Sequence, residues 1–356
     1  MNHRQLTFAR EYRGYSQTEL ADSITGLAQS NLSKFEKGFG VLSNEIQMKI
    51  IDFLDFPVEF FDKKINFTIE NANYRKRSTI NKSIVQRFEN QCKLIGYSID
   101  ELSESVEWPD FSLAQLNVED GYTPEYVAQY TRKLLELTPG EPVKNIFKLL
   151  ESRGIITYEI NENEKFDGVS FMTDKGYAVI VVNKNMSNDR KRFTIAHELG
   201  HLLLHNGFPI STYRDKETEA NNFASEFLMP ANTIKSEIRY LKMNNLYDLK
   251  KYWLTSMSSI IRRSKDLGCI DDNRYRFFMI EMSRSGYSKK EPVDVFIDNP
   301  HNFRYVLNIM KEELGYSKDD FSNYLKLPKD IINNLLFSDE MKLKISFSKM
   351  STLQSS

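Results

Sequence analysis

The 356-residue chain has few cysteines, no long apolar run and almost no net charge. Its two cysteines, Cys92 and Cys269, lie far apart in the sequence, which argues against a disulfide framework and against a cysteine-rich zinc site. No apolar stretch approaches the roughly 18 residues that a membrane-spanning helix needs. The first residues, MNHRQLTFAREYRGYS, contain no apolar segment of the kind found in secretory signals. We therefore expect a cytoplasmic protein with reduced thiols and no membrane partner.

The overall charge does not indicate a class of partner. The chain carries 48 Lys and Arg residues against 49 Asp and Glu residues, so its net charge of −1 neither favours nor excludes nucleic acid. Apolar residues make up 40% of the sequence, which is typical of an ordinary globular protein. The length exceeds that of one typical domain, and we expect two or three.

One short stretch, TIAHELGHLLLH at 194–205, holds three of the five histidines. On a helix its polar residues fall on one face and its apolar residues on the other. His197 and His201 are four residues apart, so their imidazole rings can converge on one ion. Glu198 can then reach a water molecule at the metal. The spacing His-Glu-x-x-His therefore predicts a zinc site, and the alternative is an amphipathic helix with incidental histidines.

Two further residues of this stretch carry expectations of their own. Gly200 lies in the middle of the helix, where glycine costs about 1 kcal/mol relative to alanine, and this indicates that another element packs closely there. His205 lies one turn further along the polar face, where it either supports the metal site or lies at the surface.

Zinc in a hydrolase usually takes three protein ligands. The segment KETEANNFASEFLMP, 216–230, predicts a second helix that Pro230 closes. Glu217 has Asn221 one turn later, which suits a carboxylate ligand followed by an amide that holds a ligating histidine through its other nitrogen. Spacing alone leaves Glu219 and Glu226 open as rivals of Glu217.

Together, RFTIAHELGHLLLH and ETEANNFASEFLMP resemble the ImmA/IrrE family of zinc metallopeptidases. The resemblance extends upstream through 121–160 and 176–185, which are similar to the helical lead-in and the strands of that family. A later segment, 252–292, resembles one that often follows this peptidase in longer family members.

The resemblance implies His197, His201 and Glu217 as ligands of Zn²⁺ and Glu198 as the catalytic base. It also implies an endopeptidase that acts on a specific protein substrate, commonly a helix-turn-helix repressor, so that cleavage changes gene expression.

The N-terminal segment predicts short helices. SQTELADSI and AQSNLSKFEKG form two of them around a turn, and SNEIQMKIIDFLDF forms another that Pro57 stops. The segment 14–38 resembles the Cro/repressor-like (XRE-type) DNA-binding domain, although DSITG is one residue longer than usual. The resemblance implies double-stranded DNA as a partner: Gln29, Ser30, Asn31 and Lys34 would face the major groove, and Gln17 a phosphate.

The charge of this segment weakens the case for DNA. Residues 1–65 hold 8 basic and 9 acidic residues, which is unfavourable for the electrostatic part of DNA affinity. The neighbouring stretch 73–93, with six basic residues and one acidic residue, compensates. The alternative is a protein-docking module of the same fold.

Two local patterns complete the sequence reading. Gly-Tyr-Ser occurs at 14–16, 96–98 and 315–317, each time with an acidic residue three positions after the serine. The repeat indicates either duplicated helix-turn-helix units or three independent helix starts, and the unequal intervals favour the independent starts. GVSFMTDKGYAVIVVNKN predicts two strands joined by a hairpin turn at 174–176. A strand edge beside the histidine helix would bind an extended substrate by strand addition.

We therefore expect a mainly α protein with a small β-sheet. The expected order is a helix-turn-helix bundle at 1–66, a helical linker at 67–119, a zincin-like α+β metallopeptidase domain at 120–250 and a helical region at 251–356. The expected function is a zinc-dependent endopeptidase fused to a DNA-binding domain. The alternatives are a metal-containing transcriptional regulator and an antitoxin-like docking protein without proteolysis. The intact motif favours the enzyme, because a structural metal site has no need of Glu198.

Overall fold

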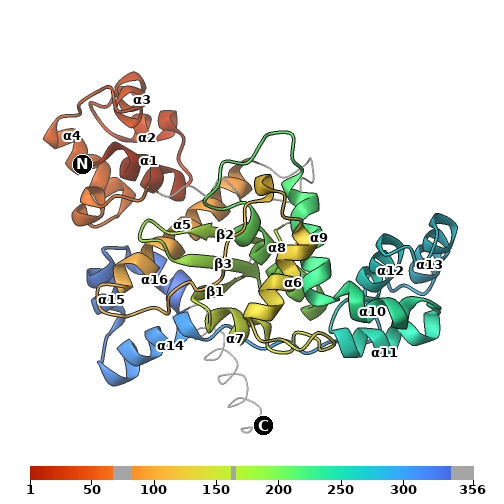
Figure 1. Ribbon diagram of the computed structural model, residues 1–356. Helices are drawn as coiled ribbons and strands as arrows, with labels where there is room; N and C mark the ends of the chain where they lie inside the picture. Colours follow the sequence, from red (N-terminus) through yellow and green to blue (C-terminus); the bar gives the residue numbers. More distant parts are fainter. Residues whose placement is uncertain (67–81, 162–165, 338–356) are drawn as a thin grey trace, which may run out of the picture.

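The computed structural model describes residues 1–66, 82–161 and 166–337. The prediction of a mainly α protein with a small sheet is confirmed, because helices surround a three-stranded sheet in the described part of the chain (Figure 1). None of the described helices combines the length and the hydropathy that crossing a membrane requires.

The N-terminal unit consists of short helices at one end of the molecule (Figure 1). Its helices are α1 (His3–Tyr12), α2 (Gln17–Ser23), α3 (Gln29–Glu36) and α4 (Asn44–Leu54), followed by the 3₁₀ turn η1 (Val58–Asp62). The predicted capping box is present: Glu19 N donates to Ser16 Oγ over 3.1 Å, and Ser16 N donates to the Glu19 carboxylate over 2.7 Å. Helices α2 and α3 lie on either side of a short turn, as their sequences predict.

The sheet contains β1 (Ile155–Ile160), β2 (Gly168–Met172) and β3 (Ala178–Asn183) in the order β1-β3-β2. Strand β1 runs parallel to β3, with Ile155 opposite Ala178, and β2 runs antiparallel to β3. The predicted hairpin is confirmed, and Gly176 in its turn has φ +87°. Among the described strands, β2 has a neighbour on one side only, so it is an edge strand.

Alternating residues of β3 face two separate cores. Ala178, Ile180 and Val182 pack in one core with α6 (Pro124–Leu134), α7 (Ile146–Glu151), α8 (Asn188–Leu204) and α9 (Lys216–Leu228). Val179 and Val181 pack in the other with the N-terminal unit, α5 (Lys82–Leu102) and the C-terminal helices. The period of two in an extended strand produces this division, because successive side chains point to opposite faces.

Two groups of helices follow the sheet along the chain. Helices α10 (Ala231–Ile238), α11 (Met243–Trp253), α12 (Met257–Asp266) and α13 (Asp272–Arg284) lie at the end of the molecule opposite the N-terminal unit (Figure 1). The second group comprises α14 (Asn302–Asn308), the π-helical turn η3 (Ile309–Glu313), α15 (Lys318–Leu325) and α16 (Lys329–Leu336). This second group returns to the sheet, where the hydroxyl of Tyr158 on β1 donates to Leu335 O.

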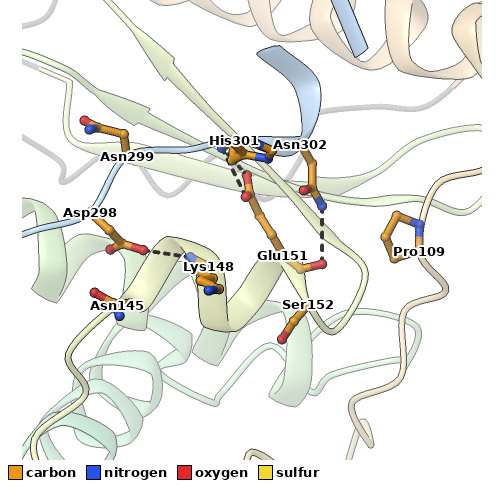
Figure 2. Close-up of a pocket in the computed structure, with 9 residues that line it drawn as sticks. All are labelled: Pro109, Asn145, Lys148, Glu151, Ser152, Asp298, Asn299, His301 and Asn302. Carbon is orange, nitrogen blue, oxygen red and sulfur yellow. Dashed lines mark hydrogen bonds between the residues drawn. The ribbon is translucent and has the colours of Figure 1, made fainter. Parts of the chain in front are cut away.

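A strap at 291–301 joins the two groups across α7 (Figure 2). The Asp298 carboxylate accepts from Lys148 N over 2.8 Å, at the positive end of the α7 dipole. The Glu151 carboxylate accepts from His301 N over 3.0 Å. These residues line an open cavity of about 650 Å³ that shares no residue with the histidine stretch. The strap holds the C-terminal group against the sheet.

One of the three predicted helix starts is wrong. Ser98 lies buried inside α5, because the apolar pattern of that helix continues through Leu94, Ile95 and Ile99 across the glycine at position 96. The start at Ser317 is confirmed, with Asp320 N donating to Ser317 Oγ over 3.2 Å. Helices α15 and α16 then repeat the arrangement of α2 and α3, namely a capped helix, a turn and a second helix.

The close packing around Gly154, in the turn before β1, predicts that one added methyl group strongly destabilises the folded protein. Gly154 has φ +80°, and a Cβ atom there would lie 2.2 Å from the backbone carbonyl of Asp110. Gly121 has φ +90° with no atom within 4 Å of such a Cβ, so it is a matched control among the described residues. We expect Gly121→Ala to lower the free energy of unfolding by about 1–2 kcal/mol. Gly154→Ala should cost at least about 2 kcal/mol more, because backbone must move. Equal losses in urea unfolding would contradict the close contact.

Candidate metal centre

Helix α8 presents the histidine stretch between the sheet and α9. Its apolar face, with Ile195, Ala196 and Leu199, is fully buried. A Cβ atom at Gly200 would lie 3.1 Å from the Phe223 ring and 3.3 Å from Ala220 Cα, so α9 packs directly on this position. The close approach predicted from Gly200 is confirmed, and it brings the polar faces of α8 and α9 together.

Three potential ligands converge where these faces meet. His197 Nε2 and His201 Nε2 are 3.0 Å apart, and each lies 3.6 Å from an oxygen of Glu217. A tetrahedral zinc ion with bonds of about 2.1 Å holds its ligand atoms about 3.4 Å apart. Glu217 Oε1 is buried and has no hydrogen-bond partner in the described part of the chain. An orphaned carboxylate oxygen beside two imidazole nitrogens fits a divalent cation.

The rival carboxylates have other partners. Glu219 accepts from Arg214 Nε over 2.7 Å and contacts His205. Glu226 is buried in an ion pair with Arg263. Of the three acidic residues that spacing leaves open, the structure therefore brings Glu217 to the two histidines.

Asn221 orients one of these histidines. Its Oδ1 lies 3.1 Å from His197 Nδ1. Because an amide oxygen only accepts, His197 carries a proton on Nδ1 in this contact and its Nε2 faces Glu217. The amide predicted from its spacing to Glu217 thus contacts a ligand candidate as expected.

Glu198 lies beside the three potential ligands but is not one of them. Its side chain is buried, and its Oε2 accepts from Ser170 Oγ on β2 over 2.8 Å. Burial raises the pKa of Glu198 to about 7, while His197 and the Ser170 hydrogen bond act in the lowering direction. A carboxyl group with this pKa can both accept and release a proton near neutral pH.

The two histidines have opposite pKa shifts. Burial lowers the pKa of His197, but Glu217 and Glu198 outweigh burial and raise it above its ordinary value. Burial holds the pKa of His201 well below its ordinary value, and the nearby His197 and His205 lower it further. His201 is therefore neutral at physiological pH, the form that a histidine ligand must take.

The comparisons with known proteins agree with this geometry. Residues 154–265 match the family model Peptidase_M78, the IrrE N-terminal-like domain. The match covers the strands, α8 and α9, and so contains all the residues of the candidate centre. It supports the ImmA/IrrE family and a zincin-like metallopeptidase for this part of the chain. No curated protein matches the sequence.

Within the Peptidase_M78 segment, the structure decides the place of His205. Its side chain is buried, with Nδ1 2.9 Å from His201 Nδ1 and Nε2 2.9 Å from Glu219 Oε2. His205 therefore contacts a ligand candidate, and the surface position left open by the sequence is wrong.

Sequence reasoning missed Ser170 and Gly168. Both lie on β2, and only the packing of the hairpin on α8 brings them to Glu198. A Cβ atom at Gly168 would lie 2.6 Å from Thr194 Cγ2 and 3.4 Å from Glu198 Cγ. Glycine at this position therefore lets the edge strand approach the motif, and no spacing in the sequence announces that contact.

The residues expected to contact DNA lie away from the Peptidase_M78 segment. Four of them are exposed on α3: Gln29, Ser30, Asn31 and Lys34. Gln29 Nε2 donates to Gln17 Oε1 over 3.0 Å, and Gln17 donates to Glu36. Much of the basic stretch 73–93, through position 81, lies outside the described residues.

The contact of β2 with α8 can be tested by a double-mutant cycle. Gly168→Ala should lower the free energy of unfolding by about 1–3 kcal/mol, because the new methyl group overlaps Thr194 Cγ2. Thr194→Ser removes that methyl group and keeps the hydroxyl. The double variant should recover at least about 0.5 kcal/mol relative to additivity in urea unfolding. Strictly additive losses would show that the two residues do not meet.

Proposed function

We propose that this chain is a zinc-dependent endopeptidase, with His197, His201 and Glu217 as ligands and Glu198 as the general base. The observation that carries the proposal is the position of Glu198. It is buried next to the three converging groups, and the carboxylate that faces the histidine nitrogens belongs to Glu217 instead. A site that only stored or sensed a metal would need the ligands alone.

The chemistry follows from the residues present. Zinc in such a site lowers the pKa of a water molecule and stabilises negative charge on a peptide carbonyl oxygen. Glu198 accepts the proton of the attacking water and passes it to the leaving nitrogen. Ser170 holds the Glu198 carboxylate, and Asn221 holds the His197 ring, so both groups have fixed orientations before substrate arrives.

The edge strand suits an extended peptide substrate. Strand β2 is an edge strand among the described strands and packs against α8 through Gly168 and Ser170. A peptide added to this edge would run beside Glu198. The family resemblance favours a specific protein substrate, such as a transcriptional repressor, as the source of that peptide, and we place the reaction in the cytoplasm.

We further propose that the N-terminal unit binds double-stranded DNA through α3. The support is the exposure of its polar residues on one helix and the Gln17–Gln29 hydrogen bond, which links that helix to the start of α2. A docking module without DNA affinity is the rival reading of the same surface.

Glu198→Gln separates an enzyme from a metal-containing regulator. The amide keeps the size of the side chain and its hydrogen bond with Ser170 but does not accept the proton of water. We expect one zinc per chain in both proteins and a loss of proteolysis of at least about 10²-fold in the variant. The measurement is elemental analysis together with the level of an intact candidate helix-turn-helix repressor when either protein is coexpressed with it.

His201→Ala is the companion variant, because it should lose both the zinc and the proteolysis. Glu107→Ala, at an exposed carboxylate outside the cluster, is the control that should lose neither. Equal loss of the repressor with wild-type protein and with zinc-loaded Glu198→Gln would exclude the proposed mechanism.

The DNA proposal is tested with the full chain and fragments of neighbouring promoters. Gln29→Ala should weaken binding to the preferred fragment by at least about fivefold and relax its preference over other sequences. Lys64→Ala removes an exposed charge from the same unit outside α3 and is the control. Absence of salt-sensitive binding to every fragment at low salt would favour the docking module.

A further inference from the structure

A chain of hydrogen bonds leads away from His201 on the side opposite Glu217. His201 Nδ1 lies 2.9 Å from His205 Nδ1, and His205 Nε2 lies 2.9 Å from Glu219 Oε2. The other oxygen of Glu219 accepts from Arg214 Nε over 2.7 Å. The side chain of His205 is only 1% exposed, so water does not compete for these contacts.

The chemistry of these groups determines which atom donates and which accepts in each of these hydrogen bonds. A carboxylate only accepts, so the proton between His205 and Glu219 belongs to His205 Nε2. Neutral His205 then has a lone pair at Nδ1 and accepts from His201 Nδ1. His201, with its proton on Nδ1, presents a lone pair at Nε2, the atom that lies 3.0 Å from His197 Nε2 and 3.6 Å from Glu217. If His205 donated to His201 Nδ1 instead, neutral His201 would carry its proton on Nε2, and that atom could not bind a metal.

We propose that His205, held by Glu219 and Arg214, is a positioning residue that fixes the tautomer and ring orientation of His201 for metal binding. This inference rests on the zinc site of the proposed function. It assigns a role to three residues outside the ligand set, namely His205, Glu219 and Arg214.

The two ligand histidines are thus held in different ways. His197 Nδ1 contacts the amide of Asn221 directly, whereas His201 Nδ1 reaches a carboxylate through a second imidazole. Asn221 and Glu219 both belong to α9, so that helix orients both histidines and supplies the third ligand as well. Arg214 comes from the segment between the helices and anchors it to the site.

The test compares zinc affinities of full-length variants by competition with a chelator. His205→Leu removes the acceptor and keeps an apolar side chain in the buried space. We expect its zinc dissociation constant to rise by about 10- to 100-fold, the usual cost of losing such a partner. His205→Asn places an amide oxygen at the position of Nδ1 but loses the contact with Glu219, so its dissociation constant should rise by less than about 10-fold.

Glu219→Gln gives a second measurement that does not alter His205. Its amide can donate as well as accept, so it no longer holds the proton of His205 on Nε2. Zinc binding should therefore weaken by about 2- to 10-fold. In the zinc-loaded wild type, the ¹⁵N spectrum should show the proton of His201 on Nδ1 and that of His205 on Nε2.

Each outcome decides between distinct conclusions. Wild-type affinity in His205→Leu and Glu219→Gln would overturn the positioning role and leave the zinc site standing. Equal weakening in His205→Leu and His205→Asn would also overturn it, because a space-filling role does not depend on an acceptor. Failure of the wild-type chain to bind zinc at all would instead exclude the proposed function, and the inference with it. Should His205→Leu not fold, the asparagine variant, Glu219→Gln and the spectrum still decide.

Discussion

The contact between α8 and α9 at Gly200 is the constraint on which the candidate centre depends. Glycine in the middle of a helix costs about 1 kcal/mol relative to alanine. In return the two helices lie so close that a Cβ atom at Gly200 would be 3.3 Å from Ala220 Cα. That approach places Glu217 3.6 Å from each histidine nitrogen and Asn221 against His197. A larger residue would separate the helices, and ligand atoms about 1 Å further apart no longer suit one zinc ion.

The β2–β3 hairpin completes the site from the other side. Gly168 allows the strand to lie against α8, and Ser170 meets the carboxylate of Glu198. The turn of the hairpin is itself held to α5, where Lys175 donates to Asp100 O over 2.8 Å. The position of Glu198, the proposed general base, therefore depends on a series of contacts that runs from one face of the sheet to the other.

The opposite face of the sheet brings the two ends of the described chain together. The N-terminal unit contacts the C-terminal group through the Arg13–Asp330 ion pair, 2.6 Å apart, and Tyr97 on α5 donates to Leu325 O. Both groups share one core with β1 and β3. The polar face of helix α3 remains exposed, so the proposed DNA surface and the candidate metal centre occupy separate parts of one molecule. Helix α16, which follows a similar turn, packs Ile331 and Ile332 into that core, as α3 packs Leu32 and Phe35.

Local pattern in the sequence was enough for much of this description. The four-residue spacing of His197 and His201 determines that they share a helix face, and the capping boxes at Ser16 and Ser317 determine where helices begin, because both depend on neighbours within one turn. The start predicted at Ser98 failed because the apolar stripe of α5 outweighs a local cap signal. Only the tertiary structure separated Glu217 from Glu219 and Glu226, brought Ser170 to Glu198 and buried His205 between His201 and Glu219. Those choices depend on how closely helices and strand pack, and residues distant in sequence acquire partners only when that packing forms.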